Sequence, residues 1–148
     1  MSGSGEALLV HSILNRSYAS RREVIEAIGD VMLTSEAITP AYIDGMLRKE
    51  EQAATIVTAE VALPHGTYDV KDAVRRNVVV VVPIPEGVEW MPGRRVRLAI
   101  GFAGAGDDVH LRLLSAVARA LSDEQTVARL KTATTHDDLA GLLTELTL

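Results

Sequence analysis

Cysteine is absent from this 148-residue sequence, and aromatic residues are scarce, with one tryptophan, one phenylalanine and three tyrosines. The absence of cysteine excludes a disulfide framework, a thiolate metal site and a thiol nucleophile, and it is typical of a cytoplasmic protein. Long apolar runs are absent too: the longest, Val78 to Ile84, is far too short to span a bilayer. We therefore predict a cytoplasmic chain with no direct membrane insertion.

Basic residues are fewer than acidic residues. Lysine and arginine total 15 against 20 acidic residues, so the net charge is −5. Nucleic acid is therefore not an expected partner, because binding it depends on clustered positive charge. With 47% apolar and 24% charged residues, the composition is that of an ordinary globular protein. We expect residues 1–5 to form a flexible leader and residues 6–148 to form one domain.

Interleaved strand and helix signals predict the fold class. Short apolar runs, several of them rich in β-branched residues, predict strands at 7–10, within 55–63, at 77–83 and at 95–100. Helix starts are predicted at Ser20 and Ser122, which open capping boxes, at Thr39-Pro40, at Asp107 or Asp108, and at Thr135. These elements indicate an α/β fold, a single layered domain in which a mixed central β-sheet is flanked by helices on both faces.

Two further features of these elements can be predicted. The valines between Asn77 and Pro83 favour a central strand that is buried on both faces. The prolines and glycine that follow, up to residue 92, predict an irregular connection containing Trp90. Residues 48–51 form the charged end of the helix that begins at Pro40.

The stretch Val61-Ala62-Leu63-Pro64-His65-Gly66-Thr67 ends an apolar, β-prone run at a proline. Pro64 has a fixed φ and biases Leu63 toward an extended backbone, so a strand ends here. Gly66 has no Cβ, so the backbone beside His65 can turn tightly and another molecule can come close. We predict an imidazole on a short, stiff loop, which suits a nucleophile or a ligand, although a Pro-His-Gly sequence is often just a turn.

A second histidine stands at a predicted helix start. His110 falls in the first turn after the glycine-rich segment 101–106 and heads an inward-facing apolar stripe. The backbone N–H groups of such a turn can hold an anion. If His65 and His110 meet at one end of the sheet, they form a pocket suited to a phosphate. Taken alone, His110 also fits a satisfied, half-buried histidine.

Other chemistries lack the residues that they need. The glycines of 101–106 are spaced G-x-x-G-x-G, which is not the order of a dinucleotide-binding fingerprint. Asp107 and Asp108 beside two histidines lack an H-x-x-x-H or cysteine partner for zinc, and no G-x-S-x-G elbow of a serine hydrolase is present. His11 and His136 look like surface or capping residues. The residues alone therefore indicate an α/β domain with a candidate histidine site.

The stretch 61–67 resembles the active-site motif of the mannitol/fructose-type EIIA domains of the bacterial phosphoenolpyruvate-dependent sugar phosphotransferase system. The likeness covers nearly the whole chain after the leader and is closest to the mannitol branch. It includes, in chain order, Met46-Leu47-x-x-Glu50, Lys71-Asp72, Pro85-Glu86-Gly87-Val88, Asp108-Val109-His110 and the tail from Leu121 through Leu139.

The resemblance implies a role for each matching position. His65 would be the phosphorylated nucleophile, which accepts a phosphoryl group from phospho-HPr and passes it to an EIIB domain for mannitol-type sugar uptake. His110 would stabilise the phosphoryl group beside it, and Gly66 and Thr67 would line the substrate site. No metal and no cofactor are implied. The sugar would be chosen by EIIB and by the membrane component EIIC, which would be an indirect partner.

One position departs from the family pattern. The mannitol branch has arginine at the fourth position of M-L-x-R-E, where this sequence has Lys49 preceded by Arg48. Lysine supplies charge without the bidentate fork of arginine, and neighbours on a helix point about 100° apart, so Arg48 is no simple replacement. We predict that Lys49 contacts the phosphoryl group. Two alternatives stay open: a regulatory EIIA of a nitrogen-related phosphorelay, and an EIIA-like binding module without phosphotransfer.

Overall fold

The computed structural model describes residues 8–58 and 60–143, and its centre is a five-stranded sheet with the strand order β1-β4-β5-β3-β2. The β1–β4 and β3–β5 pairs are parallel, whereas the β4–β5 and β2–β3 pairs are antiparallel. The strands are β1 (Leu8–Ser12), β2 (Ile56–Thr58), β3 (Val61–Ala62), β4 (Asn77–Met91) and β5 (Arg94–Ala103). The predicted mixed sheet is confirmed.

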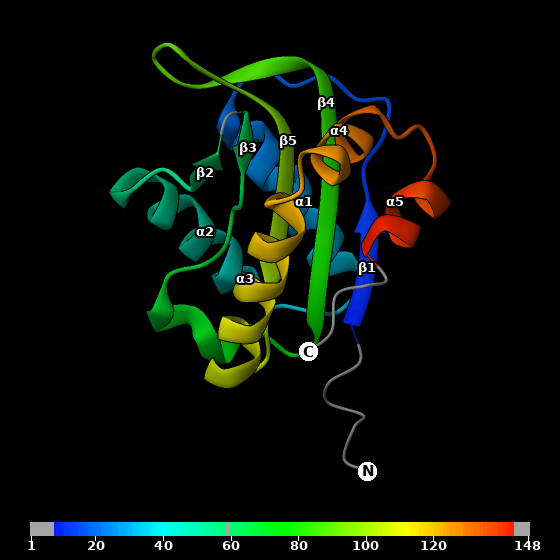
Figure 1. Cartoon of the computed structure of the whole chain (residues 1–148). Helices are drawn as coiled ribbons and strands as arrows, with labels where there is room; N and C mark the ends of the chain where they lie inside the picture. Colours follow the sequence, from blue (N-terminus) through cyan, green and yellow to red (C-terminus); the bar gives the residue numbers. More distant parts are fainter. Residues whose placement is uncertain (1–7, 59, 144–148) are drawn as a thin grey trace.

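Helices cover both faces of this sheet (Figure 1). One face packs against α1 and α2, and the other packs against α3, α4 and α5. The helices are α1 (Arg21–Thr34), α2 (Pro40–Gln52), α3 (Asp107–Leu121), α4 (Glu124–Thr132) and α5 (His136–Leu143), with a short 3-10 helix, η2 (Tyr68–Ala73). The predicted α/β class, with one sheet between two layers of helices, is confirmed.

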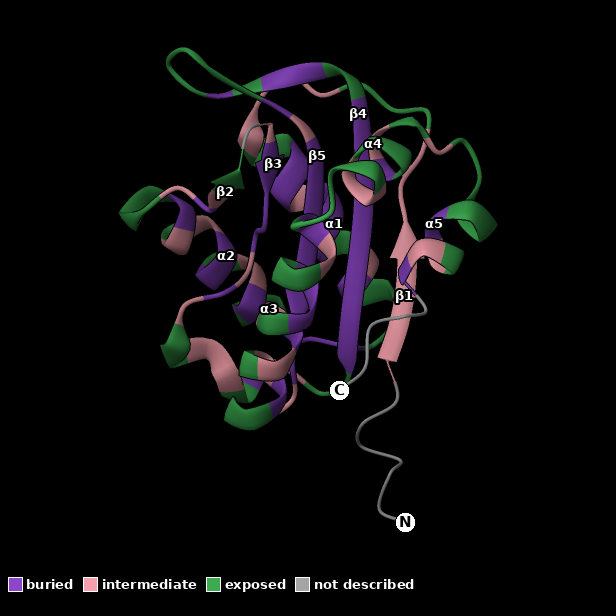
Figure 2. Ribbon diagram, viewed as in Figure 1, coloured by how far each residue is buried: buried purple, intermediate pink, exposed green. Residues whose placement is uncertain are grey.

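The run of five valines explains why β4 holds the two layers together. Successive side chains of a strand point to opposite faces. Val78, Val80 and Val82 accordingly join the core under α1 and α2, and Val79 and Val81 join the core under the other three helices. All five are fully buried, and Figure 2 shows β4 buried along most of its length. Burying one such side chain contributes about 1.5–3 kcal/mol, so β4 anchors the sheet that carries the site.

β4 continues well past residue 83, and the prediction of an irregular connection over residues 83–92 is wrong. The register between β4 and β5 shifts between Pro83 and Val88, and such irregularities tolerate proline, which has no N–H to give to a ladder. Beyond the shift, Trp90 is only 2% exposed, and its Nε1 donates to Glu50 Oε2 at 2.9 Å. Burial of the indole ring keeps the segment in the sheet.

Three helix starts lie where they were predicted. Ser20 Oγ accepts from the Glu23 N–H at 3.2 Å, which is one half of a capping box, whereas Glu23 Oε1 accepts from the Ala19 N–H at 3.0 Å rather than from Ser20. Thr135 Oγ1 accepts from the Asp138 N–H at 3.1 Å at the start of α5. Thr39 is the N-cap of α2, although its side chain makes no capping hydrogen bond.

Two predicted caps are displaced by one residue. The N-cap of α3 is Gly106, with φ of 102°, so neither Asp107 nor Asp108 caps the helix. This φ lies in the left-handed region that glycine adopts without strain, so the backbone turns one residue earlier than the acidic pair suggests. The N-cap of α4 is Asp123 rather than Ser122, because its carboxylate accepts a backbone N–H two residues further on.

The predicted leader, residues 1–5, lies outside the described residues, as do both ends of the predicted domain at residues 6–7 and 144–148. Within the described part, no helix has the length and apolar character needed to cross a membrane.

Candidate active site

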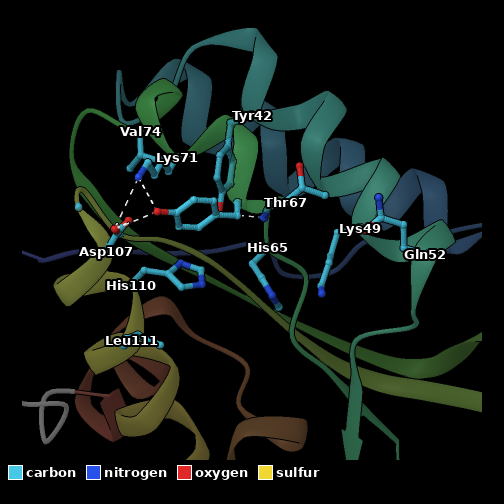
Figure 3. A pocket seen from close by; sticks show the side chains of 14 residues that line it. Tyr42, Lys49, Gln52, His65, Thr67, Lys71, Val74, Asp107, His110 and Leu111 are labelled. Carbon is cyan, nitrogen blue, oxygen red and sulfur yellow. Dashed lines mark hydrogen bonds and ion pairs between the residues drawn. The ribbon is translucent and has the colours of Figure 1, made fainter.

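The parallel pairing of β3 with β5 brings two distant histidines together. Both strands end at the same edge of the sheet, the loop after β3 carries His65, and the segment after β5 leads to α3, which carries His110. A pocket of about 570 Å³ opens there. Its walls are the end of α2, the His65 loop, η2 and the first turn of α3 (Figure 3). The two imidazole centroids lie 5.5 Å apart.

The hydrogen bond of the His65 ring determines which of its nitrogens could act as a nucleophile. Nδ1 lies 2.8 Å from the Leu63 carbonyl oxygen, two residues earlier in the chain. A carbonyl oxygen only accepts hydrogen bonds, so Nδ1 carries the proton and donates it. Nε2 of the neutral ring is then left with its lone pair, and this is the atom that can attack an electrophile.

Tyr42 fixes the same loop at Gly66, the residue that follows His65. Its phenol accepts from the Gly66 N–H at 2.9 Å and donates to the Phe102 carbonyl at 2.9 Å. Burial raises the pKa of Tyr42 to about 12, so the phenol keeps its proton. A Cβ at Gly66 would stand 2.6 Å from Tyr42 Cε1. The glycine of the Pro-His-Gly sequence is therefore required for close contact with this ring.

Phe102, at the end of β5, packs against both imidazoles. Its ring centroid lies 5.0 Å from that of His65 and 5.3 Å from that of His110. The Phe102 N–H donates to the Pro64 carbonyl at 3.1 Å, which joins the end of β5 to the His65 loop. The packing of three rings restricts both histidines to orientations that face the pocket.

The surroundings of the histidines favour their neutral forms. Burial lowers the pKa of His65 below its ordinary value of 6.5; the hydrogen bond to Leu63 opposes the shift, and the charges of His110 and Lys49 add to it. Burial also lowers the pKa of His110, against the carboxylate of Asp107, which raises it. Both rings are therefore neutral near pH 7, as a nucleophile and a hydrogen-bonding neighbour require.

The two adjacent cations of α2 have different surroundings. Lys49 lines the pocket, and Figure 3 shows its side chain reaching down beside His65. Arg48 instead pairs with Asp69 on the exposed surface, with Nη1 3.1 Å from Oδ2. Lys49 is thus the cation that stands where the family pattern has arginine.

The remaining predicted positions divide between site and surface. Gly66 and Thr67 line the pocket, but the Thr67 hydroxyl points toward α2, away from His65. His136 is exposed at the start of α5, as predicted, with Nδ1 2.8 Å from Ser12 Oγ. The prediction that His11 is a surface residue is wrong, because its ring is half-buried on β1 and its Nε2 is fully buried.

Sequence reasoning missed several residues of this site. Tyr42 belongs to the apolar stripe of α2, and nothing in its spacing signals that its hydroxyl bridges two segments. Glu50 was assigned to a charged helix end, yet it is 3% exposed and accepts from Thr55 N and Oγ1 and from Trp90. Within the described ranges, no three histidine, aspartate or glutamate side chains are grouped to hold a metal ion.

Comparison with known proteins places the chain in a family. A model of the family described as phosphoenolpyruvate-dependent sugar phosphotransferase system, EIIA 2, matches residues 10–146. The mannitol-specific phosphotransferase enzyme IIA component of Bacillus subtilis is 33% identical over 132 residues, which cover 89% of this chain and 92% of that protein. The multiphosphoryl transfer protein of Salmonella typhimurium is 37% identical over 124 residues, and the match spans 84% of this chain but only 33% of that protein.

Solved structures agree with this assignment. The complex of enzyme IIAMTL and phosphorylated enzyme IIBMTL from Escherichia coli contains a chain similar to this one, with a TM-score of 0.83, 30% identity and coverage of 90% of this chain and 93% of that one. The crystal structure of IIA mannitol from Escherichia coli has a TM-score of 0.81, 31% identity and coverage of 90% and 96%. With its strand-end His65 facing a helix-start His110, this chain belongs to the EIIA 2 family of the phosphoenolpyruvate-dependent sugar phosphotransferase system.

Proposed function

We propose that residues 6–148 act as one phosphocarrier domain, in which His65 accepts a phosphoryl group from phospho-HPr and passes it to an EIIB domain. The observation that carries this proposal is the hydrogen bond from His65 Nδ1 to the Leu63 carbonyl, which leaves Nε2 free and directed into the pocket. The similarity to mannitol-specific components supports a role in mannitol-type sugar uptake. Such a relay operates at the cytoplasmic side of a membrane permease.

The transfer step needs no cofactor. Nε2 of neutral His65 forms a bond to phosphorus while the bond from phosphorus to the donor histidine breaks, in line with the attack. The Nδ1 proton stays in its hydrogen bond to Leu63, so the positive charge that develops on the ring is shared with that carbonyl. Passage to EIIB is the same exchange in reverse, with His65 as the leaving group.

Charge stabilisation is the second requirement of the reaction, because phosphoryl transfer passes through a loose transition state whose charge lies on the phosphoryl oxygens. His110 and Lys49 line the pocket on either side of His65. We assign His110 to hydrogen bonding of a phosphoryl oxygen and Lys49 to compensation of its negative charge. Gly66 and Thr67 would shape the same subsite through their backbone.

EIIB is the partner with the most support. A similar chain forms a complex with phosphorylated enzyme IIBMTL, and the exposed Tyr68 and Leu111 at the pocket rim offer apolar contact area to such a domain. HPr as donor, and EIIC as the indirect membrane partner, follow from membership of the relay. The nitrogen-regulatory alternative rests on weaker ground, because its solved relative is only 21% identical and shares the fold alone.

The test is intact mass after incubation with phosphoenolpyruvate, enzyme I and HPr at mildly alkaline pH. We expect a gain of one phosphoryl group that brief acid treatment removes, as for a phosphohistidine. His65→Ala should abolish the gain, whereas His110→Ala should still accept the phosphoryl group, but more slowly because a phosphoryl oxygen loses its hydrogen bond, and should pass it on poorly. His136→Ala, at an exposed histidine of α5, is the matched control and should label normally.

Two outcomes would contradict the proposal. Labelling that persists in His65→Ala would place the nucleophile elsewhere. No labelling of the folded wild-type protein, in an assay where another EIIA is labelled, would support a binding module without phosphotransfer.

A further inference from the structure

Three side chains join opposite walls of the pocket at its mouth (Figure 3). Lys71 Nζ donates to Tyr68 Oη at 2.6 Å, and Tyr68 Oη donates to Asp107 Oδ2 at 3.2 Å. Lys71 Nζ also lies 3.5 Å from the same carboxylate oxygen. We call Tyr68, Lys71 and Asp107 the latch. Because Tyr68 and Lys71 belong to η2 and Asp107 begins α3, the latch connects two segments that are far apart in the sequence.

The position of the latch couples it to both histidines. η2 follows the His65 loop with only Thr67 and Gly66 between them, and Asp107 stands three residues before His110, on the same turn of α3. Gly106 is the residue that precedes α3, and a Cβ added to it would have no other atom within 4 Å. No side chain caps this helix. Hydrogen bonds from the side chains of another segment can therefore restrain the position of the first turn of α3.

We propose that Tyr68 and Lys71 are positioning residues that act through Asp107 to hold His110 against His65 during phosphoryl transfer. The inference rests on the proposed function. A phosphoryl group must meet both imidazoles, whose centroids are 5.5 Å apart, and small errors in such geometry slow a reaction considerably. In this arrangement none of the three latch residues needs to touch the reacting atoms.

Asp107 distinguishes this role from a simple effect of charge. A carboxylate at the mouth of a phosphate pocket repels the incoming group, so its removal should accelerate transfer when charge alone matters. If the carboxylate instead anchors the start of α3, its removal should slow transfer. The two interpretations therefore predict opposite signs for Asp107→Asn.

The experiment measures transfer from phospho-HPr as a function of HPr concentration. Tyr68→Phe removes the latch hydroxyl but keeps the ring, which is 70% exposed and available for docking. We expect Tyr68→Phe and Asp107→Asn each to lower the saturating rate about three- to tenfold with an unchanged KM for HPr. The double variant should be no slower than the slower single variant, because both changes disrupt the same group of hydrogen bonds.

Asp108→Asn is the matched control. It removes the same charge from the same turn of α3, but its side chain is 92% exposed and pairs with Arg112 at 3.7 Å, outside the latch. Its rate should stay within about twofold of the wild-type rate. A raised KM with an unchanged saturating rate in Tyr68→Phe would make Tyr68 a partner contact, and faster transfer by Asp107→Asn would make Asp107 a repulsive charge only. Either result would overturn the proposal that the latch positions His110.

Hydrogen exchange tests the latch without phosphoryl transfer. The His110 N–H donates to the Gly106 carbonyl at 3.1 Å in the first turn of α3. We expect this amide to exchange faster in Tyr68→Phe than in the wild-type protein and Asp108→Asn, and equal exchange rates would overturn the proposal. If the wild-type protein is not labelled, the proposed phosphocarrier function is wrong. The exchange measurement would still show whether the latch positions His110, because it does not depend on phosphoryl transfer.

Discussion

At the scale of single residues, the main question is which cation a phosphoryl group on His65 would meet. Arg48 already has a partner in Asp69 at 3.1 Å on the exposed surface. Lys49 lines the pocket, and its positive charge lowers the pKa of both His65 and His110. We therefore expect Lys49 to stabilise the phosphoryl group as a point charge, without the two parallel hydrogen bonds that an arginine can give.

Neutralising the two cations in turn tests this expectation. Lys49→Met should slow phosphoryl acceptance about 10- to 100-fold, because a charge-assisted hydrogen bond contributes about 1.5–3 kcal/mol. The same variant should raise the pKa of both histidines, since a nearby positive charge is removed. Transfer kinetics from phospho-HPr and NMR titration of the imidazoles measure the two effects.

Arg48→Met is the control, on the next residue of the same helix. It removes a cation of equal charge from outside the pocket, so both the rate and the two pKa values should stay close to those of the wild-type protein. Equal losses in the two variants would show that only the net charge of α2 matters.

At the scale of elements, Tyr42 ties α2 to the His65 loop and to the end of β5. Tyr42→Phe leaves the Gly66 N–H and the Phe102 carbonyl without their partner, both in buried surroundings. We expect the free energy of unfolding to fall by about 1–3 kcal/mol. Urea unfolding measures this loss.

Tyr18→Phe provides the comparison for Tyr42→Phe. The Tyr18 hydroxyl is buried too, but it has no hydrogen-bond partner among the described residues. Its removal should leave the stability unchanged or slightly raise it, because no hydrogen bond is lost and a buried polar atom disappears. If both variants lose the same free energy of unfolding, the two hydrogen bonds of Tyr42 do not stabilise the fold.

Glu50 links the end of α2 to β4 in a similar way. Its carboxylate accepts from Trp90 Nε1 at 2.9 Å and from Thr55 N at 2.6 Å and Oγ1 at 2.8 Å. Glu50→Ala should therefore lower the free energy of unfolding by about 1–3 kcal/mol and shift the fluorescence of Trp90, the single tryptophan. Glu51→Ala, at the exposed neighbour, should change neither property.

At the scale of the whole molecule, three half-buried histidines make stability depend on pH. Burial is the main cause of the lowered pKa of His11, His65 and His110. As the pH falls below 6.5, the unfolded chain binds protons at these positions before the folded chain does, so the folded state loses stability through this window. Well above pH 6.5 all three rings are neutral in both states, and their effect vanishes.

Urea unfolding at pH 7.5 and pH 5.5 measures this dependence. We expect the wild-type protein to be less stable at pH 5.5, and His110→Gln to lose less stability between the two values because one of the three buried groups no longer titrates. An equal loss in both proteins would mean that other groups cause the acid sensitivity.

Much of the fold was predictable from short-range patterns. The alternating faces of a strand and the 3.6-residue period of a helix are local properties, so the five valines of β4, the Ser20 cap and the end of β3 just before Leu63-Pro64 are visible in the sequence. His65 was recognisable for the same reason, since its proline and glycine neighbours act on the backbone directly. The elements whose prediction failed depend on burial by distant residues: Trp90 keeps β4 extended through prolines because Glu50 accepts its N–H.

The sequence by itself determined the α/β class, the position of the proposed nucleophile His65 on its loop and the family to which the chain belongs, because each depends on local backbone preferences or on matching residues. Only the tertiary structure decided how the site is assembled. The parallel pairing of β3 with β5 brings His110 to within 5.5 Å of His65, Tyr42 bridges two segments, and Lys49 rather than Arg48 lines the pocket. These contacts join residues separated by up to 60 positions, and no local pattern encodes a hydrogen bond whose two ends are brought together by the packing of helices on a sheet.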